Sequence, residues 1–184
     1  MIVWVRKLTD INMGICFEHV FPCGRKIQYV GMDAEWNPYT RGLRLLQISF
    51  MNHVFLVDDL RLMKSVLLYL NRIYKVGCGF RNDLSVFEIN FPDLEMDANM
   101  MIDIQTVAKT IDPSIRKVGL VSLADVYLNI QLDKEINHNL WKRRVLPPEL
   151  IEYAINDVNA ITQVFHVMLM NVTYEGLRIG TLRS

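Results

Sequence analysis

Two acidic residues stand close together in an apolar stretch of the sequence, VGMDAEW, which spans Val30–Trp36. Asp33 and Glu35 are two positions apart, and the side chains of a strand alternate between its two faces. Both carboxylates therefore project from the same face, where their negative charges repel each other. A divalent metal ion between them would remove this repulsion, because such ions accept carboxylate oxygens as ligands.

Two further segments supply acids of the same kind. Asp83 follows the apolar run YKVGCG at the first turn of an expected helix, where the helix dipole favours a negative charge. Asp157 lies in a long helical pattern, and Tyr153, one turn earlier, shares its face. Two-metal hydrolysis of a phosphodiester needs several carboxylates that converge on ions about 3.5–4 Å apart. Together these positions are candidates for such a site.

Each position also has a simpler interpretation. The D-x-E spacing recurs in PDLE, residues 92–95, where a proline precedes it and no apolar strand carries it, which favours a solvated loop. Asp83 would serve with Asn82 as a helix cap, a common role of short polar side chains. Tyr153 and Asp157 would be a boundary tyrosine and a solvated acid. Only the combination of all these positions favours chemistry.

The hydrophobic pattern predicts the elements that carry these residues. Three β-rich runs, IQYVGMDAEW, LRLLQISF and HVFLVDDL, are separated by linkers short enough for hairpins, which predicts an antiparallel meander. A helical pattern over Leu60–Leu70 follows, and the runs YKVGCG and MMIDI then alternate with helices, which indicates parallel strands added through crossovers. Helices are also expected from about Thr9 to Phe21 and from about Glu149 to Asn171.

Composition sets limits on the fold and on the partners. The 184 residues are expected to form a single domain, 1–184, and 51% of them are hydrophobic. The formal net charge is zero, so a site for a polyanion must be a local patch. The three cysteines lack the paired spacing of a disulfide framework. Cys16, His19 and Cys23 offer three zinc ligands without a fourth nearby, so an ordinary amphipathic helix is the simpler interpretation.

The sequence also bears on localisation and assembly. No apolar run approaches the length of a membrane-spanning helix, and the first residues lack the apolar core of a signal peptide. We therefore expect an intracellular protein, cytoplasmic or nuclear, that is not secreted and has no membrane partner. The generous apolar fraction leaves a homodimer open.

Taken in order, the segments DAEW, GFRNDLSVF and YAINDVNAI resemble the three exonuclease motifs of the DEDD superfamily of 3'-5' exonucleases. The spacing of Tyr153 and Asp157 is similar to that of the DEDDy subclass, which includes ribonuclease D and the Werner-type and mutator-type exonuclease domains. The run LRLLQIS resembles the second strand of the family, and DKEINHNLWKRRVLPPELIEYA resembles the segment that leads into the third motif. The resemblance covers nearly the whole chain.

The resemblance implies an α/β fold of the ribonuclease H-like type, in which three antiparallel strands precede parallel strands and helices flank the mixed sheet. It also implies two divalent metal ions, Mg²⁺ or Mn²⁺. Asp33, Glu35 and Asp157 would hold one ion, and Asp33 and Asp83 the other. Tyr153 would position the attacking water. The implied activity is 3'-to-5' hydrolysis of RNA or single-stranded DNA by a two-metal mechanism, with release of nucleoside 5'-monophosphates.

Aromatic and basic side chains near the acids are expected to hold the substrate. Trp36, Phe80 and Arg81 are close to the acids in the sequence, and Trp141 and Arg144 lie in a basic loop before the last helix. Aromatic rings stack on unpaired bases, and cations neutralise phosphates. The alternative is a solvated loop with an anchoring tryptophan. The four histidines show no paired ligand spacing, so we expect them to be structural or on the surface.

Departures from the family pattern keep other functions open. Ribonuclease D-like chains usually show Arg-Pro-Leu and a glutamine before the third motif, whereas this chain has Arg144, Val145 and Leu146, and then Leu150. An adaptor of the same fold that binds RNA or a protein partner without cleaving is therefore the alternative function. Polymerase proofreading is disfavoured, because Glu152 occupies the position where such exonucleases usually show a histidine.

Overall fold

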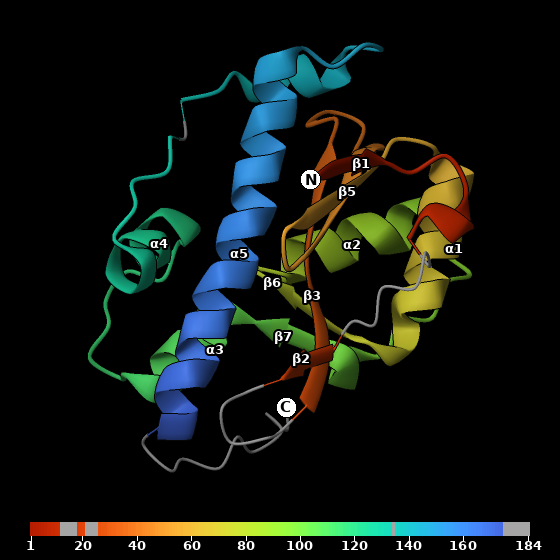
Figure 1. The fold of residues 1–184 in the computed structure, drawn as a ribbon. Helices are drawn as coiled ribbons and strands as arrows, with labels where there is room; N and C mark the ends of the chain where they lie inside the picture. The colour runs from red at the N-terminus through yellow and green to blue at the C-terminus, as the bar shows by residue number, and fades with distance from the viewer. Residues whose placement is uncertain (12–17, 21–25, 134, 175–184) are drawn as a thin grey trace.

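A mixed β-sheet forms the centre of the computed structural model (Figure 1), which describes residues 1–11, 18–20, 26–133 and 135–174. Six strands follow the order β1-β5-β4-β3-β6-β7, and β2 pairs with β3. Pairing is antiparallel among β3, β4 and β5, whereas β6 and β7 are parallel additions. The predicted meander and its parallel extension are therefore confirmed. The strands are β1 (Ile2–Trp4), β2 (Glu18–Val20), β3 (Lys26–Trp36), β4 (Leu43–Phe50), β5 (His53–Val57), β6 (Tyr74–Gly77) and β7 (Met101–Asp103).

Helices cover both faces of this sheet, with α1 and α2 on one face and α5 along the other (Figure 1). The α-helices in the described ranges are α1 (Leu60–Tyr69), α2 (Arg81–Asn90), α3 (Ile104–Ile111), α4 (Leu120–Leu128) and α5 (Pro148–Tyr174). Short 3-10 turns are η1 (Leu8–Asp10), η2 (Leu70–Arg72), η3 (Ala98–Met100) and η4 (His138–Lys142). No helix within the described residues is both long and apolar enough to cross a lipid bilayer.

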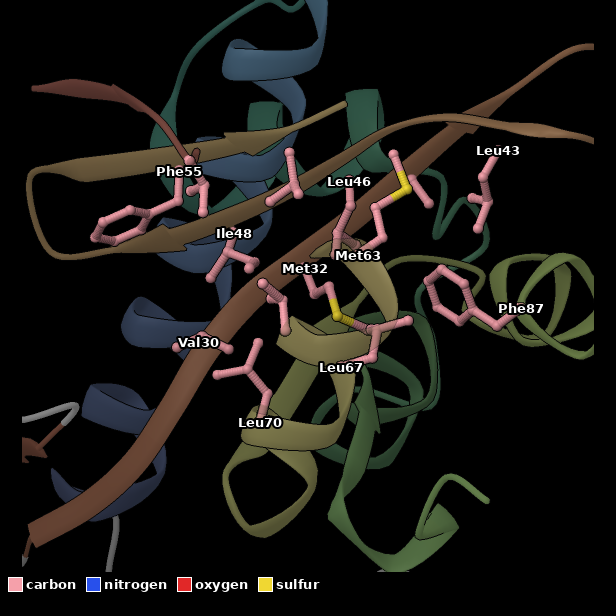
Figure 2. Close-up of a cluster of buried hydrophobic side chains, with 14 of the residues drawn as sticks. Val30, Met32, Leu43, Leu46, Ile48, Phe55, Met63, Leu67, Leu70 and Phe87 are labelled. Carbon is pink, nitrogen blue, oxygen red and sulfur yellow. The ribbon is translucent and has the colours of Figure 1, made fainter. Parts of the chain in front are cut away.

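The alternation of side chains along β3 divides its residues between the two faces. Val30 and Met32 are fully buried and belong to the cluster under α1, where Figure 2 shows them beside Leu67 and Leu70. Each such side chain contributes about 1.5–3 kcal/mol through burial. The alternate positions, which include Asp33, point to the opposite face, where α5 lies. The apolar face of β3 therefore fixes the direction of its acids.

Close packing holds α5 against β3 and β4. A Cβ added at Gly31 would lie 1.9 Å from Oγ1 of Thr162, so only glycine allows the helix to approach this strand. Polar pairs link the same layers: Ser49 donates to Asn159 at 2.9 Å, and the hydroxyl of Tyr29 lies 2.9 Å from Nδ1 of His166. These contacts fix the rotation of α5 about its axis and its position along the sheet. They thereby fix where the side chains of its first turns lie.

The helix predicted from about Thr9 to Phe21 is wrong in the residues that the structure describes. Leu8–Asp10 form a 3-10 turn, and Glu18–Val20 form β2, which pairs with the first part of β3. Ladder hydrogen bonds to the long β3 strand outweigh a local helical pattern here. Residues 12–17 and 21, and with them Cys16, lie outside the described residues, as does Cys23.

Candidate active site

A cleft of about 290 Å³ lies at the carboxyl ends of the parallel strands β3 and β6. It brings together all the acids singled out in the sequence and the tyrosine of α5. Ligand sites in α/β sheets commonly lie at this end of the strands. The lining residues are Asp33, Ala34, Glu35, Trp36, Pro38, Cys78, Gly79, Asn82, Asp83, His138, Trp141, Tyr153 and Asp157.

Asp33 and Glu35 occupy regular strand positions on the face of β3 that α5 covers. Asp33 pairs in register with Gln47 of β4, whose side chain is fully buried. The register shifts immediately after Glu35, because Trp36 pairs with Leu43 and leaves Arg44 as an extra residue on β4. Such bulges bend a strand and redirect its side chains, and they are frequent beside active sites. The regular pairing of β3 with β4 therefore ends at Glu35.

Asp83 is buried in the first turn of α2, with 4% of its surface exposed. Burial and the negative charge of Asp33 raise the pKa of this carboxyl to about 8, although the backbone amides of Ala34 and Asp83 oppose the shift. Its Oδ1 atom is buried without a hydrogen-bond partner in the described part of the chain. A buried acceptor without a hydrogen bond lowers the stability of the fold unless a bound ligand contacts it. The capping alternative is wrong, because α2 begins after Phe80 without a side-chain cap from Asn82.

Tyr153 and Asp157 lie one turn apart near the start of α5, and both line the cleft. Burial, together with the charges of Asp157 and Glu35, holds the pKa of the Tyr153 hydroxyl far above its usual range. The hydroxyl therefore remains protonated at physiological pH, and it is hydrogen-bonded to Asp157. The ring of His138 packs edge-to-face against Tyr153, with ring centroids 6.2 Å apart. Tyr153 therefore donates a hydrogen bond to Asp157, and its oxygen is left to accept a further hydrogen bond.

The donor set of the cleft fits a hard divalent cation. Its ligand candidates are carboxylates, which suit Mg²⁺ or Mn²⁺ better than softer metals. The Oδ1 atom of Asp83, which is buried without a hydrogen-bond partner in the described part of the chain, is an acceptor that a bound cation could complete. Within the residues described, however, no three His, Cys, Asp or Glu side chains are already gathered as a metal-binding cluster.

The two tryptophans predicted to stack on bases have different surroundings. Trp36 is partly exposed in the cleft, and the guanidinium of Arg41 lies 5.9 Å from the centre of its ring. Trp141 lines the cleft wall, but only 1% of its surface is exposed, because it packs with Leu45 and Leu150. The stacking role predicted for Trp141 is therefore wrong, since no face of the indole is available to a base.

The other predicted substrate residues do not line the cleft. Phe80 is 3% exposed, and its ring fills the space over Gly77, where an added Cβ would lie 2.5 Å from the ring. It is a core residue and has no free face for stacking, so that prediction is also wrong. Arg81 and Arg144 are exposed at positions outside the cleft lining. The Arg144 carbonyl accepts a hydrogen bond from Arg44 at 3.3 Å.

Several cleft residues escaped the sequence interpretation. His138, predicted to be structural or on the surface, lines the cleft beside Tyr153, and Cys78 also lines it. Arg41, which is not a lining residue but lies over the ring of Trp36, adopts a left-handed backbone with φ of 57°, and its guanidinium donates to Ser85 of α2 at 2.5 Å. None of these residues belongs to a motif of acids. The left-handed strain at Arg41 is visible only in the folded chain.

A larger hollow of about 500 Å³ lies beside α4, away from these residues. Asp125 is the one carboxylate among its lining residues, and the remainder of the lining is mostly aliphatic or amide-bearing. The larger hollow lacks the convergent acids that hydrolytic metal chemistry requires. The cleft at the end of β3 is therefore the candidate active site.

Comparisons with known proteins agree with this geometry. A family model described as 3'-5' exonuclease matches residues 17–173. Ribonuclease D of Sphingobium indicum is 29% identical over 166 residues, which cover 84% of this chain and 42% of the relative. The Aedes aegypti Nibbler EXO domain has a TM-score of 0.75 at 17% identity, covering 96% of this chain and 90% of that chain. Brucella melitensis NrnC with bound Mg²⁺ has a TM-score of 0.67 at 17% identity, covering 95% and 81%.

The mixed sheet with its covering helices is the fold of the ribonuclease H-like exonuclease domains, as the structural likeness to the Nibbler domain shows. The chain belongs to the 3'-5' exonuclease family. The resemblance drawn from the three acidic motifs is thereby confirmed. The chain spans about two fifths of the length of the ribonuclease D relatives that it matches.

Proposed function

We propose that the chain is a metal-dependent 3'-to-5' exonuclease that hydrolyses RNA or single-stranded DNA and releases nucleoside 5'-monophosphates. One observation carries the proposal: Asp33, Glu35, Asp83, Asp157 and Tyr153 come from three separate elements and line one cleft. Membership of the 3'-5' exonuclease family supports the direction of cleavage. The family match over residues 17–173 also supports one exonuclease domain in this chain.

Two divalent ions, Mg²⁺ or Mn²⁺, are proposed as cofactors. Asp33, Glu35 and Asp157 would hold one ion, and Asp33 and Asp83 would hold the other. When bound, such ions supply a water of lowered pKa and stabilise the leaving oxygen. The buried, orphaned oxygen of Asp83 supports this assignment, and so does the Mg²⁺ in Brucella melitensis NrnC, a protein of the same fold. The chain contributes the negative charge that retains the cations.

Tyr153 is proposed to orient the attacking water through its hydroxyl. The high pKa of this group keeps its proton in place on the bond to Asp157, so the hydroxyl oxygen is left to accept a hydrogen bond from the attacking water. Its bond to Asp157 and the edge of His138 restrict the ring to one orientation. A water held in one orientation reacts more readily, because its rotational and translational freedom is already lost before the transition state.

The substrate is proposed to enter beside Trp36, a partly exposed aromatic residue of the cleft. Its indole face is suited to stack on an unpaired base. Arg41 lies at the same ring, and the exposed residues Lys142 and Arg143 follow the buried Trp141, so positive charge is available for phosphates near the cleft. The relatives named ribonuclease D support RNA as a substrate.

A trimming assay tests this function. Single-stranded RNA and DNA of one sequence, labelled at the 5' end, are incubated with the protein in Mg²⁺, Mn²⁺ or EDTA, beside an Asp33→Asn variant. We expect a metal-dependent ladder that shortens from the 3' end and is absent from the variant and from EDTA. Binding of RNA without a ladder in either metal would instead support the non-catalytic adaptor.

A further inference from the structure

We propose that Asp103 is a positioning residue that clamps the turn between β6 and α2 and thereby sets Asp83 in the cleft. The inference rests on the proposed function, because it assigns a task to a residue outside the acidic motifs. Asp103 is the last residue of β7 and pairs in parallel register with Gly77, the last residue of β6. The two strands run side by side in Figure 1, and the turn that begins at Cys78 leads directly into α2.

Both carboxylate oxygens of Asp103 accept hydrogen bonds from backbone amides. Oδ1 accepts from the amide of Gly79 at 3.2 Å and from the amide of Gln105 at 2.9 Å. Oδ2 accepts from the amide of Phe80 at 3.1 Å. One side chain therefore caps α3 and, at the same time, holds two consecutive residues of the neighbouring turn. Hydrogen bonds from amides to an ionised carboxylate are stronger than neutral ones.

The clamped turn needs this support because its backbone is unusual. Gly79 has a φ of 71°, in the left-handed region that glycine adopts most readily. The helix that follows has no side-chain cap of its own. Phe80, which Asp103 holds, precedes the first residue of α2, and its carbonyl accepts the bond from Leu84 at 3.0 Å. A shift of Phe80 would therefore move the first turn of α2, including Asp83.

Asp103 acts through the turn and does not act as a ligand itself. It is absent from the residues that line the cleft. Its oxygens are already engaged by three amides, whereas Oδ1 of Asp83 is buried without a partner in the described part of the chain. Both oxygens of Asp103 therefore bind backbone, whereas Asp83 keeps one oxygen, Oδ1, that no hydrogen bond in the described part of the chain occupies.

An Asp103→Asn variant separates the clamp from the helix cap. Asparagine caps helices as well as aspartate does, so the bond from Gln105 can remain. Its amide nitrogen replaces Oδ2, and a donor then faces the Phe80 amide, which breaks the bond from Phe80, while the bond from Gly79 to Oδ1 can remain. Asp59→Asn is the matched control, because Asp59 caps α1 by accepting from Leu62 at 2.9 Å and lies outside the cleft lining.

Calorimetric titration with Mn²⁺ alone and steady-state trimming of RNA test the proposal in the full chain. We expect Asp103→Asn to weaken Mn²⁺ binding and to lower kcat by about tenfold or more, the usual effect of removing an outer-shell partner. KM and the unfolding temperature should change little, and Asp59→Asn should resemble wild type. In an Asp83→Asn background, Asp103→Asn should have no further effect.

Three outcomes overturn the inference. Wild-type Mn²⁺ affinity and kcat in Asp103→Asn would show that the clamp does not set Asp83. An equal loss in the Asp83→Asn background would show that Asp103 acts by another route. If the wild-type protein neither binds Mn²⁺ nor trims RNA, the proposed function fails and the inference fails with it, which separates that result from the other two.

Discussion

Asp33 of β3 and Asp83 of α2 lie close enough for the charge of Asp33 to raise the pKa of Asp83, in addition to the larger effect of burial. Neither residue is near the other in the sequence. The pair exists because β3 and β6 are parallel neighbours, so that the end of β3 and the start of α2 meet at one edge of the sheet. This relationship makes the cleft sensitive to protons and to cations.

The stability of the metal-free protein should depend on pH through Asp83. Its pKa is about 8 in the folded chain, above the usual 3.8, so the folded state binds the proton more tightly than the unfolded state. Stability from this group is present below about pH 4 and is lost as the pH rises towards 8. In EDTA, an Asp83→Asn variant should therefore gain stability over wild type as the pH rises from 5 to 8.

Thermal unfolding in EDTA across that pH range measures the difference. Asp93→Asn is the control, because a hydrogen bond from Lys64 lowers the pKa of this exposed carboxyl. Asp93 therefore stays ionised from pH 5 to 8, and the difference between this variant and wild type should not vary with pH in that range. A constant difference in Tm between wild type and Asp83→Asn at every pH would contradict the assignment.

Divalent cations should stabilise the wild-type protein. A ligand that binds only the folded state at 100 times its Kd adds about 2.7 kcal/mol. We expect Mn²⁺ to raise the Tm of wild type, and to raise that of Asp33→Asn much less, since Asp33 is proposed to contact both ions. Differential scanning fluorimetry with and without Mn²⁺ checks this, and an equal increase in both proteins would place the cation elsewhere.

Removal of the Tyr153 hydroxyl should slow the reaction with little effect on the fold. Tyr153→Phe keeps the ring that packs against His138 but loses the donor bonded to Asp157. We expect kcat to fall by about 10²-fold, within the range for positioned proton-handling groups, with a nearly unchanged KM. The pH profile of wild-type kcat should show no step from tyrosine below pH 9, because the pKa of Tyr153 lies far above its usual range.

The contact between Gly31 and Thr162 should be essential for the packing of α5. Gly31→Ala places a Cβ 1.9 Å from Oγ1 of Thr162 and 3.1 Å from the Val158 carbonyl. Such overpacking costs about 1–3 kcal/mol of unfolding free energy, which urea denaturation measures. Gly119→Ala is the control, because an added Cβ there meets nothing within 4 Å. Equal stabilities of the two variants would argue against a tight interface.

The catalytic constellation was predictable because its signals are local and periodic. The two-residue spacing placed Asp33 and Glu35 on one face of a strand, and the four-residue spacing placed Tyr153 and Asp157 on one face of a helix. The structure brings all of them to one cleft with Asp83. Their roles as ligands and catalysts remain proposals.

The failures of sequence interpretation share a physical cause, which is tertiary context. Trp141 and Phe80 were predicted to stack on nucleobases because they lie near acidic or basic residues in the sequence. Packing in the folded chain buries both side chains. Glu18–Val20 lie in a helical pattern, yet they form a strand because they pair with the first part of β3. His138 reaches the cleft only because η4 lies beside the first turns of α5, where it contacts Tyr153. No local pattern encodes these contacts.

The most direct test of the central claim compares two pairs of acids with the same spacing. Asp33→Asn with Glu35→Gln alters the pair in the cleft, and Asp93→Asn with Glu95→Gln alters the exposed pair outside it. Steady-state release of nucleoside 5'-monophosphates from single-stranded RNA in Mn²⁺ is measured for both double variants. We expect no detectable release from the first and a wild-type rate from the second. Unchanged release from the first would contradict the proposal that these carboxylates carry the reaction.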